Sequence, residues 1–103
     1  MKVTFKDGTV KSCNAPTEQK VFKSGTAAGW ILLLNLIGEI TSDELDTILT
    51  ENNVSELSFT PDAADENVEA LTITGYDKIS SATIRYAEDI NSSRVEIQLT
   101  KGV

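Results

Sequence analysis

The chain opens on MKVTFKDGTVKS, in which apolar and polar positions alternate on both sides of an Asp-Gly pair. Alternation with a period of two is typical of half-buried strands, and Asp-Gly is favoured in two-residue type I′ turns, where both central positions need a positive φ. The pattern therefore predicts a hairpin with Asp7 and Gly8 as its loop and Phe5 opposite Val10. In this register Val3, Phe5 and Val10 form the apolar face of the pair.

Residues 13–28 carry little pattern, and their Asn, Pro, Ser and Gly residues predict a loop. We expect Val21 and Phe22 to form a short strand there or to fix the loop to the core. Trp30 to Ile37 is an almost unbroken apolar run between glycines, which predicts a central strand buried on both faces. Because the run is short, periodicity alone leaves a buried helix open as an alternative.

The segment ITSDEL has the pattern of a helix start. Thr41 is the expected N-cap, accepting from the Glu44 amide while the Glu44 side chain reaches back to the Thr41 amide, and Ile40 packs on Leu45. The apolar stripe that follows predicts about three helical turns. The stripe consists of Leu45, Ile48 and Leu49, and Asn52 and Asn53 are expected to end the helix in the left-handed conformation.

Alternating patterns fill the rest of the chain and predict further strands. Val54 to Thr60 is one, with Leu57 and Phe59 on one face, and the last third is expected to be an antiparallel meander with one wet face. Its strands lie around Leu71–Thr74, Ala82–Tyr86 and Arg94–Thr100, with turns at Gly75–Asp77 and Asp89–Ser93. Together these elements predict one α+β domain over residues 1–103, with an antiparallel or mixed sheet of about six or seven strands and one short helix on one face.

The chain has no histidine and one cysteine, Cys13. Ser-His-Asp and Cys-His catalysis and zinc sites built from Cys and His are therefore excluded. We expect Cys13 to be a small, half-buried residue near a strand end. We also expect no enzymatic activity, no catalytic residue, no cofactor and no metal, with a carboxylate-only acid–base enzyme as the remaining enzymatic alternative.

Charge is unevenly placed in a chain of net charge −7. Residues 1–24 hold five lysines and two acidic residues, whereas residues 39–69 hold ten acidic residues and no basic one. Nucleic-acid binding needs clustered Lys and Arg, so we expect no nucleic-acid partner. This uneven distribution of charge suits head-to-tail contact between copies or docking on a basic partner, and a solvated acidic face that aids solubility is the alternative.

No apolar run reaches the roughly 18 residues of a membrane span, and no secretory signal pattern is present.

Three features of the sequence are candidate sites. The loop PDAADEN brings Asp62, Asp65 and Glu66 together without the spacing of a calcium-binding loop, so we expect a solvated loop and keep a cation site as the alternative. Tyr76 is expected to cover the core edge with its hydroxyl in water, or else to be an exposed contact residue.

Strand edges are the third feature, because an exposed edge pairs with other chains unless it is protected. We expect the last strand, Arg94 to Thr100, to be an edge used for assembly. Lys2, Lys6 and Lys11 are expected to protect the first hairpin.

MKVTFKDGT opens the chain, NAPTEQ follows the hairpin, ITSDELDTIL supplies the acidic helix, and LTITGYDKISSATI leads toward the closing strand. This order of segments resembles that of small phage and prophage proteins of Gram-positive bacteria, often encoded near tail and baseplate genes. The present chain has APTEQ where these proteins have an ATEQ-like stretch, and its apolar strand around Trp30 is longer. The resemblance implies a virion-associated or accessory role and no named activity.

The leading hypothesis is therefore a non-enzymatic phage or prophage structural or accessory protein, tail-associated and acting through protein–protein contacts. We expect protein partners, self-association through strand edges, and no small-molecule ligand or membrane. The expected location is the host cytoplasm or the virion. The alternative is a small carbohydrate- or peptide-binding module, which needs an exposed aromatic platform.

Overall fold

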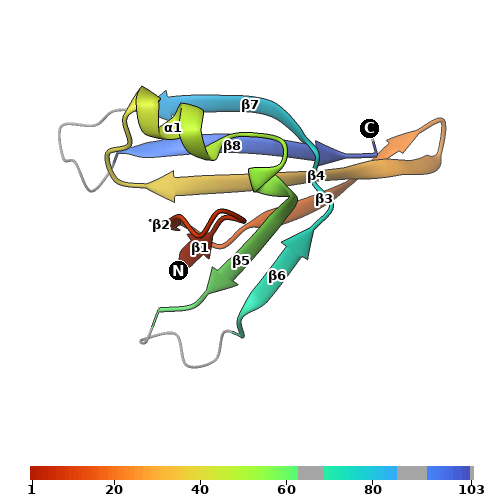
Figure 1. The fold of residues 1–103 in the computed structure, drawn as a ribbon. Helices are drawn as coiled ribbons and strands as arrows, with labels where there is room; N and C mark the ends of the chain where they lie inside the picture. Colours follow the sequence, from red (N-terminus) through yellow and green to blue (C-terminus); the bar gives the residue numbers. More distant parts are fainter. Residues whose placement is uncertain (63–68, 86–92, 103) are drawn as a thin grey trace.

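The structure, a computed structural model, describes residues 1–62, 69–85 and 93–102. Within them eight strands form two four-stranded antiparallel sheets, and a short helix lies beside these sheets (Figure 1). The first sheet, in the order β2-β1-β5-β6, consists of β1 (Lys2–Thr4), β2 (Val10–Ser12), β5 (Glu56–Thr60) and β6 (Leu71–Thr74). The second sheet, in the order β3-β4-β8-β7, consists of β3 (Thr17–Lys23), β4 (Thr26–Ile37), β7 (Lys78–Arg85) and β8 (Arg94–Lys101). The helix α1 spans Ser42–Ile48, and a short 3-10 helix, η1, spans Asn53–Ser55.

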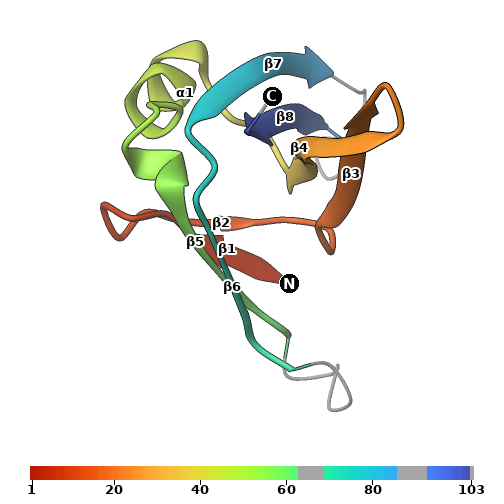
Figure 2. The ribbon, with the colours of Figure 1, turned by 90° about the vertical axis from the view of Figure 1, so that its right-hand side faces the viewer.

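Two corners join the sheets, because at each corner one edge strand continues into an edge strand of the other sheet (Figure 2). β2 leads into β3, and at this corner Cys13 bridges to Leu36 of β4. β6 leads into β7 through Gly75, whose φ is +92°, and the Asp77 amide donates to the Thr100 carbonyl over 3.4 Å. Strands that switch sheets at a bend allow two sheets to enclose one core.

The predicted α+β class with one short helix is confirmed, whereas the single sheet of six or seven strands is wrong. The last third of the chain is not one meander, because β6 pairs with β5 in the first sheet while β7 and β8 belong to the second. The closing strand β8 alternates between buried and more exposed residues as its sequence predicts, whereas in β7 Ala82 is exposed and Tyr86 lies outside the described residues. Alternation does not say which of two sheets a strand joins, and this is why the arrangement was missed.

One hydrophobic core lies between the sheets. The central strand predicted at 30–37 is confirmed as part of β4, on which Leu32, Leu34 and Leu36 are buried opposite β8. Its predicted burial on both faces is wrong, because Leu33 faces outward and is 38% exposed. The other walls of the core are formed by Val3, Leu57, Phe59 and Ile73 from the first sheet, by Val95, Ile97 and Leu99 from β8, and by Ile40, Leu45 and Ile48 at α1.

The first hairpin has a different register from the predicted one, since Val10 pairs with Thr4 rather than Phe5. The Gly8 amide donates to the Phe5 carbonyl over 2.9 Å, and Gly8 has a φ of +92° whereas Asp7 is not in the positive-φ region. This is a type I turn followed by a glycine bulge, not a type I′ turn. The extra loop residue moves Val10 to the outer face, where it is 51% exposed.

Val21 and Phe22 lie in a strand, as one of the two expectations for them held, but this strand, β3, is longer than expected and forms a second hairpin with β4 where residues 13–28 were predicted to be mainly loop. Its turn is Ser24-Gly25, with φ values of +51° and +78°, and Lys23 pairs with Thr26 across it. Two successive positive φ values are the mark of a type I′ turn, which matches the twist of the flanking strands. β3 is almost wholly exposed, so its sequence has no apolar alternation by which to recognise it.

The predicted helix start is confirmed, but the helix is shorter than three turns. Thr41 Oγ1 accepts from the Glu44 amide over 3.2 Å, while the Glu44 carboxylate pairs with Lys11 Nζ at 2.6 Å. The helix ends at Ile48, and Asn52 has right-handed helical φ and ψ values rather than left-handed ones.

Asn53 explains the early end of the helix. Its Nδ2 donates to the Ile48 carbonyl over 2.8 Å, which removes the acceptor that a further helical turn would use. Its Oδ1 accepts from the Asp7 amide over 2.8 Å, and its carbonyl accepts from the Lys6 amide over 3.2 Å. This buried amide therefore fastens the end of α1 to the loop of the first hairpin.

Candidate functional site

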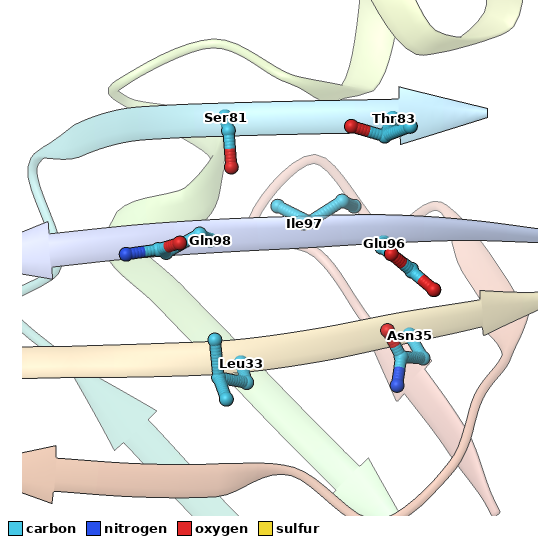
Figure 3. A pocket seen from close by; sticks show the side chains of 7 residues that line it. All are labelled: Leu33, Asn35, Ser81, Thr83, Glu96, Ile97 and Gln98. Carbon is cyan, nitrogen blue, oxygen red and sulfur yellow. The ribbon is translucent and has the colours of Figure 1, made fainter.

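The second sheet has an outer face that turns away from the core, and a shallow, mostly polar depression lies on it (Figure 3). The lining residues are Leu33 and Asn35 from β4, Ser81 and Thr83 from β7, and Glu96, Ile97 and Gln98 from β8. Their amide, hydroxyl and carboxylate groups can exchange hydrogen bonds with a polar partner. No aromatic side chain is among the lining residues, so the depression offers no stacking platform.

Both arginines of the chain meet at one end of this face. Arg85 and Arg94 are cross-strand partners, and Glu96 lies between them with carboxylate oxygens 2.9 Å and 3.0 Å from their Nε atoms. Two like charges directly opposite each other repel, so the carboxylate is needed to hold the pair. The hydrogen bond from Arg85 is the main reason that the pKa of Glu96 is lowered. Glu96 therefore remains ionised at neutral pH and acts as a charge partner.

The β3–β4 hairpin ends in an exposed tip, defined here as Lys20 to Thr26. Phe22 is 61% exposed at this tip, although it is large and apolar. Lys20 and Lys23 flank it, and Lys20 Nζ lies 5.3 Å from the centroid of the Trp30 ring. The tip thus presents an apolar side chain between two positive charges.

A groove lies between α1 and β7. In Figure 1, α1 lies near the C-terminal end of the long strand β4, whereas the exposed tip lies at the N-terminal end of this strand. Its lining residues are Ser42, Leu45, Asp46 and Leu49 from α1 and its C-cap, and Ala82 and Ile84 from β7. Its floor is mainly apolar. Asp46 is exposed at its rim, and Asp43 is exposed three residues earlier on the same helix. We call this feature the α1–β7 groove.

The predicted assembly edge is wrong, because β8 lies inside the second sheet and pairs with both β4 and β7. The edges of the described sheets are β2, β6, β3 and β7. Of the lysines expected to protect the first hairpin, Lys11 is paired with Glu44, and Lys6 Nζ donates to Asn52 Oδ1 over 3.3 Å. Lys2 lies exposed on β1, inside the first sheet.

The ring of Tyr76 packs on the core as one expectation held, whereas the solvent-exposed hydroxyl of that expectation and the alternative of an exposed contact residue are wrong. The residue is completely buried at the corner between β6 and β7, and its hydroxyl donates to Glu18 Oε2 over 2.8 Å instead of meeting water. Burial raises the pKa of the hydroxyl above its ordinary value, and the hydrogen bond to Glu18 adds to this effect. Lys101 Nζ lies 4.6 Å from the centroid of the ring. Tyr76 therefore ties this corner to β3 and β8.

Cys13 lies just after β2, as expected, but is fully buried rather than half-buried. Burial raises the pKa of its thiol to about 11.

Of the proposed cation ligands, Asp65 and Glu66 lie outside the described residues, and Asp62 Oδ2 is 2.6 Å from the amino group of Met1. In the described part of the chain, no group of three His, Cys, Asp or Glu side chains is placed to hold a metal ion.

Sequence reasoning missed both the exposed tip and the groove. The signal for the tip was present, because the run EQKVFK places two large apolar residues among charged and polar ones without alternation. The groove has no local signal, because it is formed by residues far apart in the chain.

None of the helices in the described ranges is long and apolar enough to cross a membrane. Searches against protein-family models, curated proteins and solved structures each returned no match.

Proposed function

We propose that this chain is a non-enzymatic structural subunit that associates with copies of itself head to tail, through two ends of opposite charge. The observation that carries the proposal is the position of the charges. The exposed tip carries Lys20 and Lys23, and α1 carries the exposed Asp43 and Asp46. In the described part of the chain, neither Lys23 nor Asp46 makes an ion pair, so both are available to a partner.

The two ends are too far apart to meet within one molecule. β4 joins them and has 12 residues, which at about 3.3 Å per residue corresponds to nearly the whole of the 43 Å long axis. A contact between the tip and the acidic end must therefore form between molecules. Such a contact joins two different surfaces, so it repeats and builds a ring or a filament.

The resemblance to phage and prophage proteins suggests the setting. We propose a tail-associated structural or accessory role, in the virion or in the cytoplasm of the infected host. A subunit that repeats through its two ends suits such an assembly. Contact through the edge strand β3, whose residues are nearly all exposed, would extend the same hairpin surface.

The test is sedimentation velocity over a range of protein concentrations at low and high salt. We expect concentration-dependent association that weakens with salt, because exposed charges are screened. Lys20→Glu with Lys23→Glu should reduce association at low salt. The matched control, Lys2→Glu with Lys6→Glu, changes the net charge equally in and beside β1 and should not. A monomer at every concentration and salt would contradict the proposal.

A carbohydrate- or peptide-binding module is the second candidate, and the polar depression on the second sheet is the observation that favours it. The absence of aromatic residues from its lining places this candidate second. NMR titration with neutral and acidic oligosaccharides tests it directly. Shifts confined to Asn35, Thr83 and Gln98 would favour this candidate over self-association.

A further inference from the structure

We infer that Phe22 of one copy inserts into the α1–β7 groove of the next copy. This inference rests on the proposed head-to-tail association and names the residues that meet in it. The occupant of the groove is thus a second copy of this chain, held by an apolar contact surrounded by ion pairs.

Phe22 is the most exposed large hydrophobic side chain that the structure describes. The others that are exposed, namely Val10, Leu33 and Leu71, lie on sheet faces and are exposed by 38–51%, whereas Phe22 is 61% exposed near a turn. An exposed aromatic ring gains free energy on transfer out of water, and aromatic anchors dominate the energetics of many protein interfaces. Its position near the turn allows it to reach a concave surface.

The α1–β7 groove can receive such a ring. Leu45, Leu49, Ala82 and Ile84 form an apolar lining that no described side chain covers completely, since Ala82 is exposed and Leu49 and Ile84 are half-buried. α1 lies beside β7 (Figure 1), which is an edge strand of the second sheet. A partner can therefore approach the groove between them from this edge.

The charges around the two surfaces are complementary. Lys20 and Lys23 flank the ring, while Asp46 is at the rim of the groove and Asp43 lies beside it on α1. With Phe22 in the groove, the two ammonium groups face the two carboxylates. The polar rim would exclude water from the apolar contact and set its orientation. The tip and the α1–β7 groove of one molecule cannot contact each other, because the length of β4 separates them.

The test compares Phe22→Ser and Ala82→Gln with wild type by sedimentation velocity. Both variants leave every charge in place. The first removes the ring, and the second fills the groove with a polar side chain. We expect each to raise the dissociation constant by about tenfold or more, while the remaining association keeps its dependence on salt. The matched control is Val10→Ser, which removes another exposed apolar side chain from the first sheet and should bind like wild type.

The outcomes separate this inference from the proposed function. If wild type associates but Phe22→Ser matches Val10→Ser, the insertion is wrong and the charge-guided association stands. If wild type itself is monomeric under all conditions, both fail. All three substitutions are at exposed positions, and circular dichroism at each concentration verifies that the variants are folded.

Discussion

Asn53 shows how a single residue determines the packing around it. It is one of the few buried polar residues that the structure describes, and its side chain bonds to the end of α1 and to the loop of the first hairpin. The sequence suggested a different role, that of a helix stop in the left-handed conformation. A buried amide can be recognised only when its partners are known, because they lie 46 residues away in one case and five in the other.

We predict that Asn53→Ala lowers the free energy of unfolding by about 2–4 kcal/mol, because it leaves the Asp7 amide and the Ile48 carbonyl without partners. Urea unfolding followed by circular dichroism measures the change. Asn52→Ala is the matched control, since Asn52 is exposed and its side chain accepts one exposed hydrogen bond from Lys6, and we expect a loss below about 1 kcal/mol. Equal losses in the two variants would show that the Asn53 side chain does not hold the end of α1 against the loop of the first hairpin.

At the scale of elements, the two corners carry groups whose pKa values are raised. The thiol of Cys13 lies where β2 passes toward β3, and burial raises its pKa from 9.0 to about 11. The unfolded chain ionises this thiol near 9.0, so unfolding releases a proton between about pH 9 and 11 and the free energy of unfolding falls as pH rises. Below pH 9 the group has no effect on the pH dependence.

We predict that Cys13→Ala makes this decline shallower by up to about 1.4 kcal/mol per pH unit. Urea unfolding at a series of pH values from 7 to 11 gives the slope. Ser12→Ala, at the neighbouring exposed position, should retain the wild-type slope. A Cys13→Ala slope that is the same as that of wild type would mean that the thiol already ionises in the folded chain near its ordinary value.

The elements also show what the sequence predicts well. Leu32, Leu34 and Leu36 lie on a strand with enough apolar residues to be recognised, and Thr41 starts the helix as predicted because capping is local. The full length of β3 and its hairpin were missed because both faces of this strand are exposed to solvent. The register of the first hairpin was wrong because Asp-Gly fits two turn types that differ by one residue. The candidate surfaces were missed because they depend on which elements become neighbours.

At the scale of the whole molecule, two surfaces of opposite charge are separated by the length of β4. The lysines of the tip and the aspartates of α1 belong to the basic and acidic parts of the sequence, so the charge asymmetry was visible before the fold. The fold adds that these charges lie at opposite ends. Opposite ends of unlike charge favour head-to-tail contact over contact between identical surfaces.

The most direct test mixes two charge-reversed variants, Lys20→Glu with Lys23→Glu and Asp43→Lys with Asp46→Lys. Each variant alone carries like charges at both ends and is expected to remain monomeric, near 11.2 kDa, by light scattering at low salt. In the equimolar mixture every tip again meets an end of opposite charge, so we expect association to return. A mixture that stays monomeric while wild type associates, or a single variant that still associates like wild type, would contradict head-to-tail association through these charges.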